Sequence, residues 1–335
     1  MTAPTRKLNF IQSINEALAE AMAADPKVLL LGEDVADREG GGVVGLTSGL
    51  STRFGDQRVR STPISEQAII GAAIGAAVNG YKPVAEIMLM NFTTVAMDMI
   101  VNHAAKLRYM SGGQTGVPIT IRTMTGAGIS SAGQHSDFLE AWFAHTPGLK
   151  VAAASNPADA KGLLLACIAD PDPCIFIECT RAYGQSGEVP ADQGPIPLGK
   201  ANVVQQGNDI TIVSYSEIFV RAVAAAAELA KENVSVELID LRTISPWDRY
   251  TVIASARKTG RVLIAHEAVR QFGVGAEIAA TIQEEAFASL KAPVKRLGAP
   301  YAPVPFSQPL EQSYIVSARE IANAARALLG APGRG

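Results

Sequence analysis

The sequence lacks the features that mark several large classes of protein. Among its 335 residues it has no block of basic side chains, and its formal net charge is −3, so nothing in it resembles a nucleic-acid-binding surface. No apolar signal core follows its first residues, and no uncharged apolar run approaches the roughly 18 residues of a membrane span. We therefore expect a cytoplasmic protein that binds neither nucleic acid nor a membrane.

Cysteine and histidine are also scarce, and their spacing argues against a metal centre built from their side chains. The three cysteines are Cys167, Cys174 and Cys179, an odd number without metal-ligand spacing. Free, buried thiols in a reducing compartment are the expected state. The four histidines show no zinc spacing with one another.

The glycine-rich segments lack the complete motifs of nucleotide-binding loops. Gly126-Ala-Gly128 and Gly273-Val-Gly275 both miss the third glycine of a dinucleotide fingerprint. There is no P-loop and no Gly-x-Ser-x-Gly elbow, so a hydrolase triad has no supported nucleophile.

The sequence does contain a regular alternation of apolar strands and helices, which predicts an α/β fold with a mostly parallel sheet. The alternation breaks at residues 181–197, which are rich in glycine and proline and read as a linker. We expect an N-terminal domain at residues 1–190 and a smaller α/β domain at residues 198–335.

Local signals predict where several of these elements begin. Asn9 with Gln12 forms a capping-box pattern before the first helix. Residues 93–110 read as one helix, and Ser136 is placed to cap a helix over residues 137–144. Residues 39–49 are rich in glycine and predict a mobile loop.

Residues 62–80 hold the most informative pattern. Ser65 is a natural N-cap, which puts Glu66 in the first turn of an apolar helix. Glycine weakens a helix interior by about 1 kcal/mol relative to alanine. Gly71 and Gly75, four residues apart, therefore suggest that something packs closely on that face. The pattern alone is more typical of an ordinary helix start, where the macrodipole favours an acid.

His135 lies in a glycine-rich loop after a predicted strand. An imidazole there can exchange a proton near neutral pH, which suits catalysis or ligand contact. The alternative is a loop histidine that bonds to backbone. For His103 and His145 we favour structural roles.

Several segments in this order resemble a known family. They are residues 62–66, 86–98, 108–113, 134–136, 143–151 and 155–162. Together they resemble the beta subunit of the thiamine-diphosphate-dependent decarboxylating component of 2-oxo acid dehydrogenase complexes. The resemblance runs from about Leu8 to Leu329. It implies a transketolase-like pyrimidine-binding domain followed by a transketolase C-terminal-type domain.

The resemblance also implies that this chain carries half of a cofactor site. In the family the beta subunit holds the aminopyrimidine ring, and an alpha subunit holds the diphosphate through Mg²⁺ and a Gly-Asp-Gly motif. That motif is absent from this sequence. A separate alpha chain is therefore expected, in a heterotetramer of two alpha and two beta chains, with a lipoyl acyltransferase as the next component.

The matching residues imply specific roles. Glu66 matches the glutamate that hydrogen-bonds the pyrimidine ring nitrogen and so sets the tautomer that takes a proton from the thiazolium ring. Phe92 matches the aromatic residue that stacks on the aminopyrimidine, although a core aromatic before a helix would look the same. His135 matches the histidine at the mouth of the site, where it would stabilise an intermediate or transfer a proton during acyl handover.

Two further points concern the acidic chain and potassium. Asp98 matches an acid that, in the family, belongs to a chain of acidic residues linking two active sites. Some members carry another acid one turn earlier. Here that position is Val95, which leaves proton coupling between the sites open. Family members bind a structural potassium ion through main-chain oxygens. The matching positions are Ile119, Cys167, Ile168, Asp170 and Asp172.

The expected activity is that of a 2-oxo acid dehydrogenase that decarboxylates its substrate and passes the acyl group to lipoyl, with pyruvate as the default. Acetoin dehydrogenase and one half of a split transketolase-like transferase are the alternatives. No residue of this chain selects among these substrates.

Overall fold

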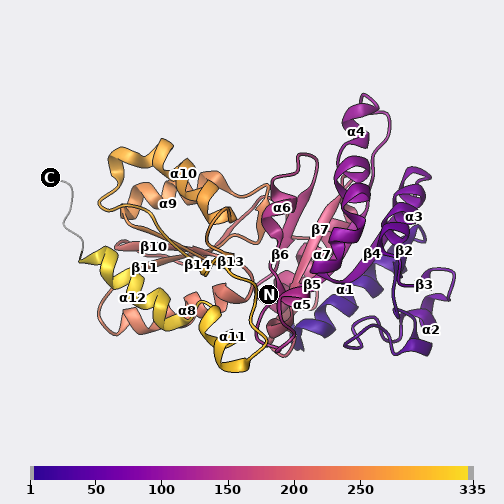
Figure 1. Cartoon of the computed structure of the whole chain (residues 1–335), viewed down its shortest axis with the longest axis horizontal. Coiled ribbons are helices and arrows are strands. Elements are labelled where there is room, and N and C mark those ends of the chain that lie inside the picture. Colours follow the sequence, from indigo (N-terminus) through magenta and orange to yellow (C-terminus); the bar gives the residue numbers. More distant parts are fainter. Residues whose placement is uncertain (1–3, 331–335) are drawn as a thin grey trace. The chain divides into compact units, whose positions relative to one another are not determined.

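The structure is a computed structural model and describes residues 4–330. The chain divides into two compact units (Figure 1). The N-terminal unit comprises the described residues up to Thr125 together with Trp142–Leu198. The C-terminal unit comprises Gly126–Ala141 and the residues from Gly199 onward. Residues 126–141 thus belong with the C-terminal unit, whereas the sequence suggested that they lie inside the N-terminal domain.

The N-terminal unit is built on a parallel sheet with the strand order β6-β7-β5-β4-β2-β3. Every neighbouring pair in this run is parallel. Its strands are rich in Val, Ile and Leu because both faces are covered. They are β2 (Val28–Gly32), β3 (Val59–Ser61), β4 (Lys82–Leu89), β5 (Thr120–Thr125), β6 (Lys150–Ala153) and β7 (Cys174–Cys179).

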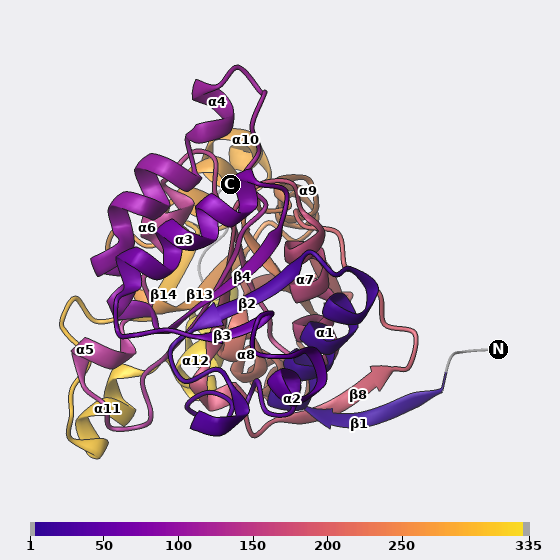
Figure 2. The same cartoon turned by 90° about the vertical axis from the view of Figure 1, so that its right-hand side faces the viewer.

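Helices cover both faces of this sheet. Helices α1 (Phe10–Ala24) and α7 (Pro157–Ala169) pack together over a core that includes Phe10, Ile14 and Leu163. Helix α3 (Glu66–Val78) lies on the opposite side of the strands (Figure 2). The shorter helices are η1 (Asp37–Glu39), α2 (Leu50–Phe54), η2 (Met90–Ala96), η3 (Met99–Ala104), α4 (Leu107–Met110) and η4 (Thr180–Ala182). Helix α6 (Glu140–Ala144) spans the point where the chain re-enters this unit.

The C-terminal unit contains a five-stranded sheet of order β14-β13-β10-β11-β9 within the described residues. Its pairs are parallel except that β9 runs antiparallel to β11. The strands of this unit are β9 (Asn202–Gln205), β10 (Ile210–Ser214), β11 (Val236–Asp240), β12 (Thr243–Ser245), β13 (Val262–Val269) and β14 (Lys295–Ala299).

Two pairs of helices enclose this second sheet. Helices α8 and α12 pack on one face, and α9 and α10 pack on the other (Figure 1). Ser317 and Glu320 form a capping box at the start of α12, and Asp248 caps α9. The helices of the unit are α5 (Gly133–Ser136), α8 (Ser216–Ala230), α9 (Arg249–Thr259), α10 (Val274–Ala286), η5 (Phe287–Ser289), α11 (Gln308–Tyr314) and α12 (Ala318–Leu329).

The glycines that resemble a dinucleotide motif instead make room for a buried histidine. His266 on β13 is fully buried, and its Nδ1 lies 3.1 Å from the Ala268 carbonyl oxygen. A Cβ on Gly273, Gly275 or Gly298 would come within 2.9 Å of the imidazole ring. Burial lowers the pKa of His266 to about 4, so the ring is neutral at pH 7.

The local sequence signals gave mixed results. The capping box of Asn9 and Gln12 is present. The single helix expected at residues 93–110 is instead a 3₁₀ turn, a π-helical turn and a short α-helix. In the 3₁₀ turn the Thr93 and Thr94 hydroxyls bond backward to main-chain carbonyls, which competes with regular α-helix bonding.

Three further expectations need correction. Ser136 does not cap a helix over residues 137–144, because it ends α5 and Asp137 is extended. The supposed linker contains β8 (Ser186–Pro190), paired antiparallel with β1 (Thr5–Asn9). The loop at residues 39–49 is tied down rather than open, since Thr47 bonds the Val35 carbonyl and Asn15 bonds the Leu46 and Ser48 carbonyls.

Gly275→Ala should destabilise the protein because the new Cβ would lie 2.8 Å from His266 Nε2. We expect the free energy of unfolding to fall by about 1–3 kcal/mol, the usual cost of overpacking a core. Urea denaturation measures this change. Gly184→Ala is the control, because in the described part of the chain no atom other than those of its sequence neighbours lies within 4 Å of its Cβ position. Equal stability of the two variants would contradict the packing role of Gly275.

Candidate functional site

Three carboxylates gather in the N-terminal unit near the carboxyl ends of its central strands. Glu33 follows β2, Glu66 begins α3 shortly after β3, and Glu86 lies in β4. All three are buried. Burial raises the pKa of Glu33, and the charges of Glu66, Asp34 and Glu86 raise it further. This edge of a parallel sheet is where α/β proteins place their ligands.

Glu66 occupies the position that the sequence predicted, at the first residue of α3. Its side chain retains 8% of its exposure, and in the described part of the chain no hydrogen bond reaches its carboxylate. Ser65 is the N-cap residue, but its side chain makes no capping bond. The free N–H groups of the first helical turn favour a negative charge at this place.

Phe92 lies on η2, which packs against α3. Its ring is half-buried. The structure therefore places Phe92 on an element next to the Glu66 helix, within the same unit.

A buried ionic network lies beside these acids. Arg122 on β5 is 2% exposed and contacts Glu86 on β4 at 2.6 Å and Glu178 on β7 at 2.7 Å. The Tyr183 hydroxyl donates to Glu178 at 2.7 Å. Removing one partner of a buried ion pair lowers the free energy of unfolding by about 3–5 kcal/mol, because the other charge is left buried and unpaired. Arg122 therefore holds three strands and one member of the acidic cluster together.

A small cavity opens over this network. Its volume is about 10 Å³, which is room for about one water molecule. Its walls are Val43, Val44, Leu46, Glu86, Met88, Arg122, Thr123, Met124, Glu178 and Tyr183.

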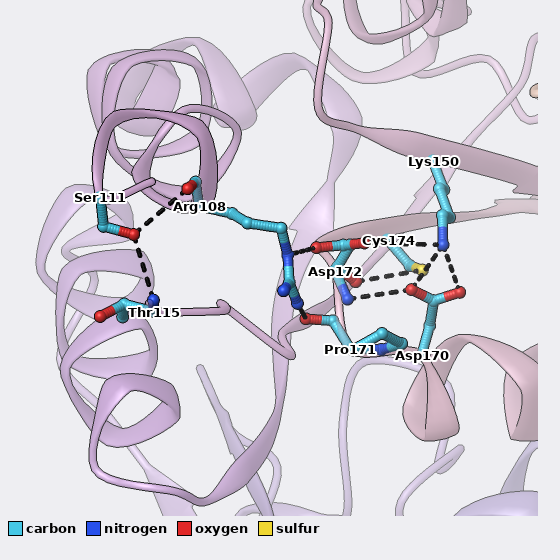
Figure 3. A network of polar contacts seen from close by, with 8 residues as sticks. All are labelled: Arg108, Ser111, Thr115, Lys150, Asp170, Pro171, Asp172 and Cys174. Atoms are coloured by element: carbon cyan, nitrogen blue, oxygen red, sulfur yellow. Dashed lines mark hydrogen bonds and ion pairs between the residues drawn. The ribbon is translucent and has the colours of Figure 1, made fainter. Parts of the chain in front are cut away.

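Asp170 and Asp172, two of the positions predicted to ligate potassium, lie in the turn between α7 and β7 (Figure 3). There Lys150 Nζ donates to both Asp170 oxygens at 2.7 and 2.6 Å, and Arg108 pairs with Asp172. The side-chain charges of the turn thus balance among themselves, and a bound cation would have to use main-chain oxygens.

The main-chain oxygens of this turn are partly occupied. The carbonyls of Ile119, Cys167 and Asp172 accept hydrogen bonds from Cys174 N, Asp170 N and Cys174 Sγ respectively. A carbonyl oxygen has a second lone pair, so these bonds leave ligation feasible. Carbonyl oxygens suit a hard cation. Potassium at these positions, which include Ile168, stays a prediction.

His135 belongs to the C-terminal unit, on the short helix α5. Its main-chain N–H donates to the Ala132 carbonyl at 3.2 Å. The preceding loop is anchored by carboxylates of the same unit. Glu267 accepts from the Ala127 N–H at 3.0 Å, and Glu311 accepts from the Gly128 N–H at 2.6 Å.

Glu140 is a buried acid within residues 126–141. It is fully buried and accepts a hydrogen bond from the Tyr215 hydroxyl at 2.8 Å, while its other oxygen, Oε2, has no hydrogen-bond partner among residues 4–330. Burial raises the pKa of Glu140 to about 8, with Glu267 adding to the rise. At neutral pH Glu140 is therefore mostly a neutral carboxylic acid.

Comparison with known proteins agrees with this architecture. Residues 6–185 match the transketolase pyrimidine-binding domain, and residues 199–321 match the transketolase C-terminal domain. The chain is 47% identical over 329 residues to the acetoin:2,6-dichlorophenolindophenol oxidoreductase subunit beta of Cupriavidus necator, covering 96% of this chain and 97% of that protein. It is 42% identical over 329 residues to the mitochondrial pyruvate dehydrogenase E1 component subunit beta-2 of Oryza sativa subsp. japonica, covering 97% and 87%.

The chain belongs to the family of E1 beta subunits of thiamine-diphosphate-dependent 2-oxo acid and acetoin dehydrogenases. A solved split-gene transketolase has the same fold, with a TM-score of 0.78 and 22% identity over 95% of this chain and 97% of that one. The fold class expected from the sequence is therefore confirmed.

The residues of this beta subunit fit the ring end of the cofactor of its family. Glu66 is a buried acid with no hydrogen bond at its carboxylate in residues 4–330, placed at a helix N-terminus. Such an acid suits a ring nitrogen that needs a partner.

Within residues 4–330 no group of three or more His, Cys, Asp or Glu side chains could hold a metal ion. None of the helices described in the structure combines the length and apolar character needed to cross a bilayer.

Sequence reasoning about this beta subunit missed the residues that connect distant segments. Arg122, Glu178 and Tyr183 were not selected, although charged residues inside buried strands must find partners. That rule would have found the Arg122 network. Glu140, Glu267 and Glu311 had no comparable local signal.

Glu140→Gln should change the pH dependence of stability. The folded chain holds the Glu140 proton more tightly than the unfolded chain, because its pKa is about 8 rather than 4.5. The free energy of unfolding of the wild type therefore falls as the pH rises through this range. The variant cannot ionise, so its stability relative to the wild type should grow from pH 4.5 to pH 8, by at most about 1.4 kcal/mol per pH unit.

Urea denaturation across this pH range measures the effect. Glu284→Gln is the control, since Glu284 is an exposed acid on α10 of the same unit. If the wild type and Glu140→Gln give parallel profiles, Glu140 is ionised in the folded protein and the assignment is wrong.

Proposed function

We propose that this beta subunit forms an enzyme with a separate alpha chain and that acetoin is its substrate, with pyruvate as the second candidate. The sequence expectation had these two in the opposite order. The support for acetoin is the 47% and 44% identity, over nearly the whole chain, to two acetoin oxidoreductase beta subunits. Beta subunits of pyruvate dehydrogenase are 42–44% identical to this chain, which makes pyruvate the second candidate.

We propose that Glu66 holds the aminopyrimidine ring of thiamine diphosphate. When bound, the cofactor supplies the carbanion and the electron sink for cleavage next to the substrate carbonyl. Glu66 would hydrogen-bond the ring nitrogen from a place where little water competes. Glu33, whose pKa is raised by burial and by Glu66, can hold a proton next to it. Phe92 would stack on the ring from η2.

His135 would act on the substrate side, by stabilising the intermediate or by moving a proton during acyl transfer to a lipoyl group. Mg²⁺ and the diphosphate would be held by the alpha chain, because this chain lacks the Gly-Asp-Gly motif. Potassium would bind at the turn of Asp170 and Asp172.

An exposed apolar surface supports assembly with other chains into two alpha and two beta subunits. Helix α3 has only apolar residues after Gln67, yet it leaves Ala68, Ala72 and Gly75 exposed. Large apolar side chains stay exposed on and around α3, η2 and α4: Ile64, Val78, Tyr81, Val95, Tyr109 and Met110. Exposed apolar side chains on neighbouring elements are typical of protein interfaces.

The function is tested by a substrate panel on the chain co-expressed with its alpha partner. Turnover of acetoin, pyruvate and branched-chain 2-oxo acids is followed by reduction of 2,6-dichlorophenolindophenol with added thiamine diphosphate and Mg²⁺. We expect kcat/KM for acetoin to exceed that for pyruvate by about tenfold or more, equivalent to 1.4 kcal/mol in the transition state. The reverse order assigns the chain to pyruvate. Transfer of a carbon fragment to an aldehyde, without dye reduction, would replace both by the transferase alternative.

Glu66→Gln should abolish most of this turnover while leaving the fold intact, because the amide has the same shape but cannot exchange a proton as a carboxyl group does. We expect kcat to fall by about 10²–10⁴-fold, the usual contribution of acid–base catalysis. Glu188→Gln, at an exposed position on β8, is the control and should retain full turnover. Near-wild-type turnover of Glu66→Gln in an assembled complex would remove Glu66 from the mechanism.

A further inference from the structure

The loop that leads to His135 has an unusual backbone. Four alternate residues have positive φ: Gly126 (117°), Gly128 (113°), Ser130 (55°) and Ala132 (58°). Glycine adopts this region freely, but Ser130 and Ala132 have a Cβ that opposes it. Such a backbone persists only where its surroundings enforce it.

The enforcing groups are two buried carboxylates of the C-terminal unit. Glu311 on α11 is 1% exposed. It accepts from the Gly128 N–H at 2.6 Å and from the Ser130 N–H at 3.2 Å through Oε1 and 3.0 Å through Oε2, with the Ser130 hydroxyl at 3.5 Å. Glu267 on β13 adds the Ala127 N–H at 3.0 Å. Figure 2 shows α5 and α11 side by side.

These bonds are of the strong kind. A carboxylate that accepts from main-chain N–H groups makes charge-assisted hydrogen bonds, about twice as strong as neutral ones. In residues 4–330 no cation pairs with Glu311, so the loop amides are its main partners. Packing adds a second restraint, because a Cβ on Gly133 would lie 3.2 Å from Pro303.

We infer that Glu311 is a positioning residue for His135. It holds Gly128 and Ser130 in their positive-φ conformations, and five residues after Ser130 the same chain presents the imidazole. Glu267 supports the beginning of the loop in the same way. This inference rests on the proposed role of His135 in the reaction.

The first test does not depend on activity. Hydrogen exchange of the full-length chain is compared for the wild type, Glu311→Ala, Glu311→Gln and the control Glu320→Gln. We expect Glu311→Ala to lower protection in residues 126–135 by about tenfold or more, because the amides lose their acceptor. Glu311→Gln keeps one carbonyl oxygen and should give a smaller loss, which keeps the test usable if the alanine variant folds poorly. Glu320→Gln should leave this segment unchanged. Equal protection in all four chains would overturn the inference.

The second test asks whether the effect reaches His135. With isotope-labelled histidine, Glu311→Ala should shift or broaden the His135 ring resonance, assigned by its loss in His135→Ala, and leave those of His103 and His145 in place. An unchanged His135 resonance would also overturn the inference.

The third test uses turnover of the complex with the alpha chain. We expect Glu311→Ala to lower kcat by about 10–100-fold with a smaller change in KM, as for a misplaced catalytic group. In the His135→Ala background the same change should cost less than about twofold, because coupled residues are non-additive. Losses that multiply would mean that Glu311 acts elsewhere. If the wild-type complex turns over no substrate, the proposed function fails, while exchange and the His135 resonance still decide the role of Glu311.

Discussion

The N-terminal unit depends most on the ion pairs of the buried Arg122 guanidinium. It lies between Glu86 and Glu178, so charged residues from three neighbouring strands meet in a buried region. Without Arg122 the acids Glu33, Glu66 and Glu86 would form an uncompensated negative cluster. With it, Glu86 is neutralised, and Glu66 can sit at the N-terminus of helix α3. The ion pair thus helps the fold to tolerate the buried Glu66, the residue proposed to hold the cofactor ring.

In the C-terminal unit, main-chain amides rather than a cation stabilise a buried carboxylate. Glu311 is surrounded by main-chain N–H groups of the glycine loop. Glu140 is buried next to the Tyr215 hydroxyl, and its raised pKa leaves it mostly protonated at neutral pH. Both arrangements fix residues 126–141 to this unit, although the chain on either side of the segment belongs to the other. The loop of His135 is therefore controlled by side chains that follow it by more than a hundred residues.

Helix α3 shows what this chain leaves for others to complete. The sequence suggested close packing on the face of Gly71 and Gly75. Met99 contacts the Gly71 position, with Sδ 3.5 Å from an added Cβ, but within residues 4–330 no neighbouring atom lies within 4 Å of a Cβ added at Gly75. A glycine in a helix interior with no neighbour weakens the isolated chain. It makes sense where another subunit approaches the helix closely, as proposed for the alpha–beta assembly.

The sequence by itself determined the local features. The capping box of Asn9 and Gln12, the position of Glu66 at the first turn of α3 and the α/β alternation rest on interactions within a few residues. Ordered motifs over the whole length were enough to indicate the family. Only the tertiary structure decided that residues 126–141 join the second unit and that His266 explains the Gly273–Gly275 pair. It alone brought Glu311 to Gly128 and Tyr215 to Glu140, pairs separated by 183 and 75 residues. The reason is physical. Helix caps and periodicity depend on residues that are neighbours along the chain. The partner of a buried charge depends on which distant segments pack together, and that is decided only when the chain folds.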